Sequence, residues 1–362
     1  MARKSILVGN VPVGGGAPIT IQSMTTTKTS NITETINQIS QLTDLGCDII
    51  RVAVPDKESA LAIERIKENI KIPLVADIHF DHKLALLAIE SGADKIRINP
   101  GNIGSEDGIR AVAKLCNQKK IPIRVGVNSG SLSREILLKH GGVTADALIE
   151  SALENIRLLN KHDFDDICIS AKTSSVPLTI SVYRKLYETM DYPLHIGVTE
   201  AGTEYAGIIK SSIGIGALLA DGIGDTIRVS LTASPHQEVK AAKVILKAFG
   251  LSRGFDLISC PTCGRCNFDL MKMSDEVEAQ LINIERSYKS LSKLITVAVM
   301  GCVVNGPGEA SRADYGIAMG KTDGVVFKKG SIISKLPVER LTDALLTAII
   351  EGENLQKEYS TA

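Results

Sequence analysis

The chain has 362 residues, of which 44% are hydrophobic, and its 41 basic residues balance its 41 acidic residues. This length predicts about two domains, and a net charge of zero excludes a bulk field that would attract nucleic acid or an anionic membrane. Neither partner is expected, so any anion site must be a local cluster of basic groups.

The start, MARKSILVGN, lacks the apolar stretch of a secretory signal. The longest apolar run, ITVAVMGCVV, is too short to span a membrane. We expect a soluble, cytoplasmic protein.

Short β-type runs alternate with helical patterns up to about residue 250. Eight strands are predicted, at residues 19–24, 48–54, 73–78, 94–99, 122–127, 166–170, 193–198 and 226–230. In the helix pattern TETINQISQLTDLG, Ile36, Ile39 and Leu42 mark one face and Gly46 can end the helix. The long interval between the fifth and sixth strands carries an extra helical segment, ADALIESALENIRLLN.

Eight strand–helix units in about 250 residues have the count and length of a TIM-type (β/α)₈ barrel. A doubly wound open sheet is the competing fold, but no G-x-G-x-x-G follows the first strand. We therefore predict a barrel domain over residues 1–252. The chemistry of such barrels lies at the C-terminal ends of the strands.

Basic residues recur near those strand ends. Five of them lie in or just after five different strands: Arg51, Arg97, Arg124, Lys172 and Arg228. A single arginine in a strand is often part of a structural ion pair. Five that converge on one mouth suit the oxygens of phosphate or diphosphate, which guanidinium groups bind bidentately. The sequence therefore predicts an anionic, phosphorylated substrate.

Several polar residues near the strand ends allow two interpretations. Lys172 could form a Schiff base, as in barrel aldolases, or contact phosphate, which we favour beside the arginines. Glu200, in GVTEAG, could act on a substrate or pair with one of the arginines. His79 and His195 could orient substrate or cap strand ends. Three cysteines within apolar patterns are expected to be inert buried thiols: Cys47, Cys116 and Cys168.

The pattern breaks at LSRG (251–254), and residues 253–362 form a second predicted α/β domain. We expect a helix around 275–291, a strand at 295–300, a hairpin within 316–330 and a C-terminal helix from about 337. ISCPTCGRC places Cys260, Cys263 and Cys266 at steps of three, and Cys302 lies in GCVVNGPGE. Seven cysteines, clustered late in a chain expected to be cytoplasmic, argue against a disulfide framework and for a metal.

Two kinds of metal centre fit the cysteines. Zinc prefers four thiolate or imidazole ligands, often in paired C-x₂-C motifs, but Cys302 has no second cysteine nearby and no histidine follows His236. A [4Fe–4S] cluster is also commonly held by closely spaced cysteines and a distant one. The ligands would come from Cys260, Cys263, Cys266 and Cys302, with Glu309 as a candidate oxygen ligand. Spacing alone does not decide between these sets.

The motifs RVAVP, IRINPGN, HIGVTEAG, IRVSL, SCPTCGRC and GCVVNGPGE follow one another along the chain. Together they closely resemble the bacterial 4-hydroxy-3-methylbut-2-enyl diphosphate synthase family over essentially the whole length. The resemblance implies a barrel followed by a small iron–sulfur domain similar to those of sulfite and nitrite reductases. It also implies a [4Fe–4S] cluster whose ligands are Cys260, Cys263, Cys302 and Glu309, with Cys266 outside the ligand set.

The resemblance also implies a reaction of isoprenoid precursor biosynthesis. In this reaction 2-C-methyl-D-erythritol 2,4-cyclodiphosphate is reductively opened and dehydrated to 4-hydroxy-3-methylbut-2-enyl diphosphate, with two electrons supplied by flavodoxin or ferredoxin. Glu200, predicted at the barrel mouth, is our own candidate for the residue that positions or protonates the leaving hydroxyl. A homodimer is implied, in which the cluster domain of one chain closes the barrel of the other. The substrate-binding residues would be Arg51, Arg97, Asn99, Arg124, Asn128, Lys172, His195, Arg228 and Ser230.

Two other functions compete with this one. The first is a barrel aldolase or pterin-type synthase that uses Lys172 or the arginines, with a structural zinc site at the cysteines. The second is a non-enzymatic zinc-ribbon module fused to a barrel that has lost its activity. The identity of the bound metal separates both from the iron–sulfur enzyme.

Overall fold

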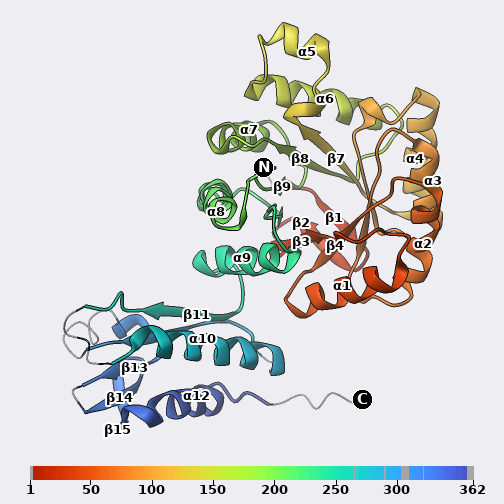
Figure 1. The fold of residues 1–362 in the computed structure, drawn as a ribbon. Coiled ribbons are helices and arrows are strands. Elements are labelled where there is room, and N and C mark those ends of the chain that lie inside the picture. The colour runs from red at the N-terminus through yellow and green to blue at the C-terminus, as the bar shows by residue number, and fades with distance from the viewer. Residues whose placement is uncertain are drawn as a thin grey trace. The chain divides into compact units, whose positions relative to one another are not determined.

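The computed structural model describes residues 3–263, 266, 268–288, 291–302, 310–320 and 322–356. It divides into two compact units, residues 1–245 and 246–362 (Figure 1). Among the described helices, none is long and apolar enough to cross a membrane.

The first unit is a parallel eight-stranded barrel. Its strands are β3 (Thr20–Met24), β4 (Ile49–Ala53), β5 (Leu74–Asp77), β6 (Lys95–Ile98), β7 (Ile123–Asn128), β8 (Ile167–Lys172), β9 (His195–Ile196) and β10 (Thr226–Ile227). They pair in the order β8-β7-β6-β5-β4-β3-β10-β9. A parallel bridge between Ile169 in β8 and Leu194, which precedes β9, closes the ring. The predicted TIM-type barrel and its eight strands are therefore confirmed.

Helices alternate with these strands and surround them (Figure 1). They are α1 (Ile32–Asp44), α2 (Lys57–Lys67), α3 (His82–Glu90), α4 (Glu106–Lys119), α5 (Arg134–Lys139), α6 (Ala145–Asn160), α7 (Val176–Thr189), α8 (Glu204–Ala220) and α9 (Pro235–Ala248). The segment 145–160, expected to be the extra helix, is instead the crossover helix α6, which packs on β7 and β8. The additional helix is the short α5, whose six residues are too few to show a clear apolar period.

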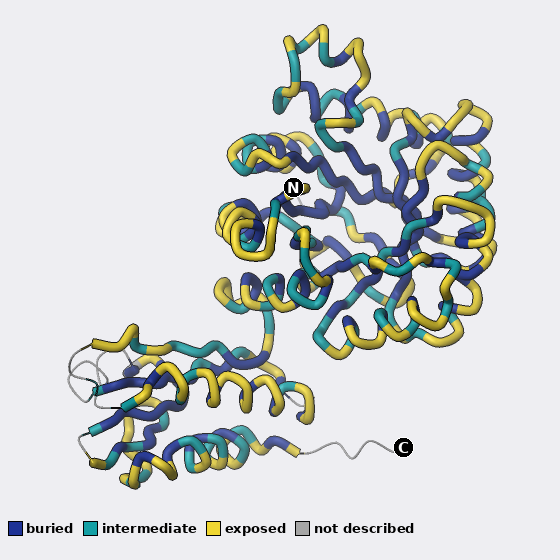
Figure 2. The backbone as a smooth tube through the Cα atoms, viewed as in Figure 1, coloured by how far each residue is buried: buried dark blue, intermediate teal, exposed yellow. Residues whose placement is uncertain are grey.

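The apolar periods seen in the sequence become the buried faces of the helices. Ile39 and Leu42 of α1 and Ile63 and Ile66 of α2 are fully buried against the strands. Helix starts are set by side chains that accept a hydrogen bond from the first turn, as Asp56 does from the backbone N–H of Ser59. Buried residues concentrate in the strands, and exposed ones lie on the outer helix faces (Figure 2).

An N-terminal hairpin covers one end of the barrel. Strands β1 (Ser5–Val8) and β2 (Val11–Gly14) pair antiparallel. Their buried residues pack against Ile49, Val75 and Cys168, which lie at or near the N-terminal ends of β4, β5 and β8. This hairpin was not predicted from the sequence. It closes the barrel end opposite to the one where the strands' C-termini meet.

The second unit is a five-stranded mixed sheet with helices on one face. Its strands are β11 (Gly254–Ser259), β12 (Leu294–Met300), β13 (Tyr315–Met319), β14 (Asp323–Lys328) and β15 (Ser331–Pro337), paired in this order. The first three are mutually parallel and the last three antiparallel. Helices α10 (Leu270–Ser287) and α12 (Leu341–Gly352) share a hydrophobic core with the sheet. The predicted hairpin is β13–β14, whereas β11 and β15 were not expected. A likeness to sulfite and nitrite reductase domains stays a prediction.

Candidate functional site

Charged residues line the barrel where small and branched apolar residues are usual. Residues that alternate along a strand face the same side, so Lys95 and Arg97 of β6 share one face, as do Arg124 and Asn128 of β7. Across the strands, Asp77 is opposite Arg97, and Arg97 is opposite Arg124. The barrel therefore places the predicted basic residues side by side.

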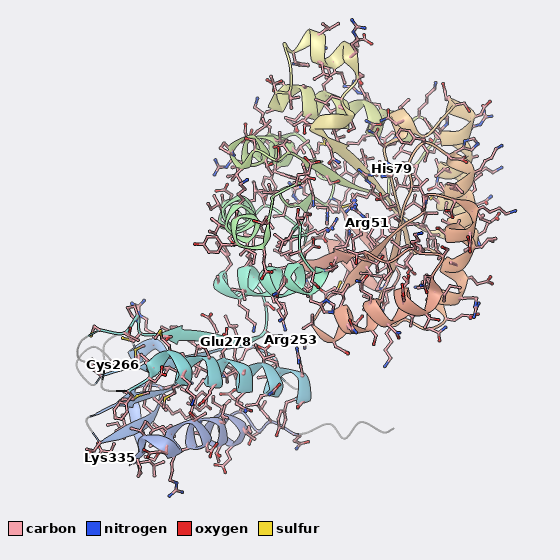
Figure 3. All side chains as sticks on the ribbon, in the orientation of Figure 1. Arg51, His79, Arg253, Cys266, Glu278 and Lys335 are labelled. Carbon is pink, nitrogen blue, oxygen red and sulfur yellow. The ribbon has the colours of Figure 1, made fainter. Side chains whose placement is uncertain are left out.

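Asp77 connects two of the basic residues. Its Oδ1 lies 3.1 Å from Nη1 of Arg97, and its Oδ2 lies 3.5 Å from Nη2 of Arg51. His79 joins the group, with Nε2 2.9 Å from Nη1 of Arg97. Figure 3 labels His79 and Arg51 within the barrel. Burial alone would raise the pKa of Asp77, but Arg51, His79 and Arg97 lower it well below its usual value. Asp77 is thus an anion that orients two guanidinium groups.

A second carboxylate, Glu238, holds Arg228. Its Oε2 lies 3.4 Å from both Nε and Nη2 of Arg228, and its Oε1 accepts from the backbone N–H of Leu231 at 2.9 Å. Met24 links this arginine to the first group, because its Sδ lies 3.1 Å from Nε of Arg51 and 3.7 Å from Nη1 of Arg228. Sequence reasoning missed Glu238. The feature that could have indicated it is a carboxylate next to Val239 on the buried face of α9.

Arg124 and Lys172 complete a group that we call the cation cluster: Arg51, Arg97, Arg124, Lys172 and Arg228. Arg124 is 1% exposed, and its Nε and Nη1 have no hydrogen-bond partner among the described residues. Two glycines make room for the cluster. A Cβ on Gly126 would lie 2.5 Å from Nε of Arg97, and one on Gly197 would lie 2.8 Å from Nζ of Lys172.

The cation cluster carries more positive charge than its paired carboxylates neutralise. Asp77 and Glu238 are the two carboxylates that form ion pairs with it in the described part of the chain. Burial, followed by repulsion from Arg124 and Arg228, lowers the pKa of Lys172 well below its ordinary value. Burial and then Arg97 lower the pKa of Arg124 to about 10. An incoming anion would relieve this repulsion and pair with the open donors of Arg124.

A pocket of about 360 Å³ adjoins the cation cluster and includes Arg97 in its wall. Asn99 and Asn128, both predicted site residues, line it as well. Oδ1 of Asn99 is buried without a partner among the described residues. The backbone of its loop is held by buried Asn155 of α6, whose Oδ1 accepts from Gly101 N–H at 2.6 Å. We call this cavity the mouth pocket.

The other predicted barrel residues lie in different surroundings. His195 is fully buried, and burial followed by Lys172 and Arg124 lowers its pKa well below the usual value. Ser230 is half-buried two residues after Arg228. Glu200 is exposed in the loop after β9, with a left-handed backbone at φ +51°. In the described part of the chain the cation cluster pairs with Asp77 and Glu238, not with Glu200.

Four cysteines follow the strands β11 and β12 in the chain, and we call this region the cysteine edge: Cys260, Cys263, Cys266 and Cys302. Cys260 directly follows β11 and Cys302 closely follows its parallel neighbour β12, so both lie at the same sheet edge. Cys266 donates a backbone hydrogen bond to the carbonyl of Cys263 at 2.9 Å. A Cβ on Gly301 would lie 3.0 Å from its Sγ, which places Cys266 beside the residue preceding Cys302. Figure 3 shows Cys266 at the end toward which β11 runs.

The donors at the cysteine edge fit a soft metal centre in their chemistry. None of the four forms a disulfide, and each is exposed or half-buried. Glu309, the predicted fourth ligand, lies outside the described residues. Within the part that is described, no three cysteine, histidine, aspartate or glutamate side chains already converge on one metal position. Sulfur ligands at one sheet edge suit zinc or an iron–sulfur cluster.

The remaining cysteines are buried, as predicted. Cys47, Cys116 and Cys168 lie in the barrel unit and are at most 3% exposed. Burial raises the pKa of Cys47 and of Cys116 to about 12. These thiols are therefore poorly ionised at neutral pH and unsuited to bind a metal.

Comparison with known proteins gives consistent matches over both units. A family model described as the GcpE TIM-barrel domain matches residues 3–243, and one for the GcpE protein C-terminal domain matches residues 256–351. A protein of Caldanaerobacter subterraneus is 54% identical over 98% of this chain and 98% of its own. One of Caldicellulosiruptor saccharolyticus is 56% identical over 96% and 98%. Both are named 4-hydroxy-3-methylbut-2-en-1-yl diphosphate synthase (flavodoxin).

Among solved structures, a dihydropteroate synthase of Yersinia pestis superposes with a TM-score of 0.50 at 10% identity, covering 68% of this chain and 98% of that one. A likeness at this identity concerns the barrel fold alone. The two family models, in contrast, together span most of the chain, and the relatives share more than half of its residues over nearly its full length. The chain belongs to the GcpE family.

Proposed function

We propose that the protein is a 4-hydroxy-3-methylbut-2-enyl diphosphate synthase, an oxidoreductase of isoprenoid precursor biosynthesis. Its substrate is 2-C-methyl-D-erythritol 2,4-cyclodiphosphate. Two electrons are consumed as a carbon–oxygen bond of the ring breaks, a hydroxyl leaves as water and a carbon–carbon double bond forms. Membership of the family and the names of the relatives support this activity. The structural observation that carries it is the buried cation cluster, whose excess charge matches a diphosphate.

The cation cluster binds the diphosphate, with Ser230 assisting. Arg51 and Arg97 are already oriented by Asp77, so little conformational freedom is lost when they bind an anion. Arg124 contributes the Nε and Nη1 donors that have no partner among the described residues. Asn99 and Asn128 contact the substrate from the wall of the mouth pocket. His195, which is fully buried, is the predicted substrate ligand with the least direct access.

Glu200 is our candidate for the residue that positions or protonates the leaving hydroxyl. Its carboxylate is exposed in the loop after β9, at the C-terminal end of the barrel strands where the cation cluster lies. A left-handed backbone at a non-glycine residue is costly and is found more often at functional sites than elsewhere. These observations support a functional carboxylate, and its role in the reaction stays a prediction.

A [4Fe–4S] cluster would be held by Cys260, Cys263, Cys302 and Glu309. Such a cluster supplies electrons one at a time and an iron that acts as a Lewis acid. The thiols at the cysteine edge support it, because Cys260 and Cys302 follow neighbouring parallel strands. Cys266 remains outside the proposed ligand set. The relatives' names favour flavodoxin over ferredoxin as electron donor, while a homodimer and a cytoplasmic location stay predictions.

The metal content of anaerobically purified protein tests this function. We expect about four iron and four acid-labile sulfide per chain, with turnover of the cyclodiphosphate by reduced flavodoxin. Cys302→Ser should lose most of the iron and the turnover. Cys266→Ala is the matched control and should keep both.

Two results would contradict the proposal. Zinc in place of iron would favour the barrel aldolase or pterin-type synthase with a structural zinc site. Iron lost from Cys266→Ala but retained in Cys302→Ser would show that Cys266, and not Cys302, belongs to the ligand set.

A further inference from the structure

Phe80 is a large aromatic residue that the barrel leaves outside its own core. It lies in the short loop between β5 and α3 and is 74% exposed. The same residue lines the mouth pocket. An exposed aromatic in the wall of a binding cavity is a candidate ligand contact, because it has apolar surface that the protein itself does not bury.

The backbone holds Phe80 in a strained position. Asp81 donates its backbone N–H to the carbonyl of His79 at 2.8 Å, and Phe80 between them has φ +63°. A γ-turn with a positive φ at its central residue is rare and strained, and a positive φ is an outlier for a bulky side chain. Both ends of the turn are fixed. His79 is held by Arg97, whose Nη1 lies 2.9 Å from Nε2 of the histidine, and Asp81 caps α3 by accepting from the backbone N–H of Lys83.

The turn places an apolar ring in the same cavity as the charged site. The ring of Phe80 lies 5.9 Å from that of His79, centroid to centroid. His79 in turn contacts Arg97 of the cation cluster. The mouth pocket thus combines apolar side chains, Ile78, Phe80 and Leu132, with the polar groups of Arg97 and Asn128. A ligand with a charged diphosphate and a small carbon skeleton matches both kinds of wall.

We propose that Phe80 contacts the carbon skeleton of the substrate and selects for ligands that carry one. The cation cluster binds the diphosphate, and the ring of Phe80 packs against the five-carbon part beside it. Inorganic pyrophosphate offers the diphosphate group, with at least as much negative charge, but without the skeleton, so Phe80 contributes nothing to its affinity. This inference rests on the proposed function, since it takes the substrate from there.

Binding measurements on the metal-loaded protein test the proposal. Dissociation constants are measured by calorimetry for the cyclodiphosphate and for inorganic pyrophosphate. Phe80→Ala should weaken the binding of the cyclodiphosphate about tenfold, because an aromatic contact is lost. The dissociation constant for pyrophosphate should stay within about twofold of the wild-type value. Phe80→Leu, which keeps apolar bulk, should recover part of the loss. Leu61→Ala, at an exposed apolar site on α2, is the control and should bind both ligands normally.

Thermal unfolding separates this role from a structural one. Phe80→Gly suits the positive φ, so its melting temperature should equal or exceed that of the wild type. A clear fall would show that the ring stabilises the fold and would overturn the proposal.

Other outcomes are equally decisive. If Phe80→Ala bound both ligands equally more weakly, Phe80 would shape the cation cluster instead of contacting the carbon skeleton. Unchanged affinity for both would remove any role in binding. If Phe80→Ala sedimented as a smaller assembly than the wild type, the ring would contact a second copy of the chain and not the substrate. Wild-type protein that binds neither ligand would overturn the proposed function, and this inference with it.

Discussion

In the barrel mouth, Arg51 and Arg97 are held by Asp77 and Arg228 by Glu238. At the cysteine edge, in contrast, no three of the described donors converge on one metal position. The sulfur atoms of Cys260 and Cys263 make no hydrogen bond within the described part of the chain. The fold alone therefore preorganises the anion site. For the proposed metal site, we expect the metal itself to bring the donors together, because metal binding is commonly coupled to folding.

The two regions also differ in what they cost the fold. Burying several like charges opposes folding unless carboxylates or a bound anion compensate them. Half-exposed thiols impose little such penalty, because they remain in contact with water. An anion should thus stabilise the barrel through charge, and a metal should stabilise the C-terminal unit through new bonds.

Thiol reactivity should show the largest difference between the regions. Native, metal-free protein should be alkylated at Cys260, Cys263 and Cys266. The three buried barrel cysteines should react at least about a thousandfold more slowly, because burial raises the pKa of Cys47 and Cys116 to about 12. Iodoacetamide labelling followed by peptide mass spectrometry measures this. Modification of Cys168 as fast as Cys263 would contradict it, and labelling in denaturant is the control.

Asp77→Asn should destabilise the barrel by about 3 kcal/mol, because it leaves Arg51 and Arg97 without their shared anion. The pKa of Asp77 is lowered in the folded state, so its contribution is present above the unfolded pKa of about 3.9. It is lost as the pH falls below that value, toward the lower folded pKa. The free energy of unfolding, measured with urea from pH 7 to pH 3, should therefore fall less steeply at acid pH in the variant than in the wild type.

The matched control for this prediction is Asp107→Asn, which breaks an exposed ion pair with Arg110. It should change the free energy of unfolding by less than about 0.5 kcal/mol. An Asp77→Asn variant as stable as this control would show that Asp77 does not hold the arginines.

Arg124→Met should have opposite effects on binding and on stability. Affinity for inorganic pyrophosphate should fall about thirtyfold, or about 2 kcal/mol, because an anion loses the open donors of Arg124. Without ligand, the free energy of unfolding should rise by about 1 kcal/mol, because a buried cation repelled by Arg97 is removed. Calorimetry and urea unfolding measure the two. The control is Arg184→Met, at an exposed ion pair with Asp221, which should change neither the affinity nor the free energy of unfolding. A loss of stability in Arg124→Met would contradict the proposed repulsion between Arg124 and Arg97.

Much of the site was visible in the sequence because it depends on local pattern. Alternating strands and helices indicated the barrel, and a barrel brings the ends of its strands together wherever they lie in the chain. The five members of the cation cluster could therefore be named before the structure was known. The steps of three in the cysteine run likewise indicated a metal centre, although spacing could not choose between zinc and iron or settle the role of Cys266.

Other features depend on contacts between distant segments. Met24 and Arg228 are 204 positions apart in the chain, and their contact links two groups of the cation cluster. Asp77 ends a strand and Glu238 lies in a helix, and nothing in the local sequence marks either of them as a partner of the arginines. The strained turn at Phe80 arises because both its neighbours are held elsewhere. The sequence by itself determined which basic residues lie at the strand ends, since periodicity is local. The tertiary structure decided which of them are paired and which remain open to a ligand, since pairing depends on packing across the barrel.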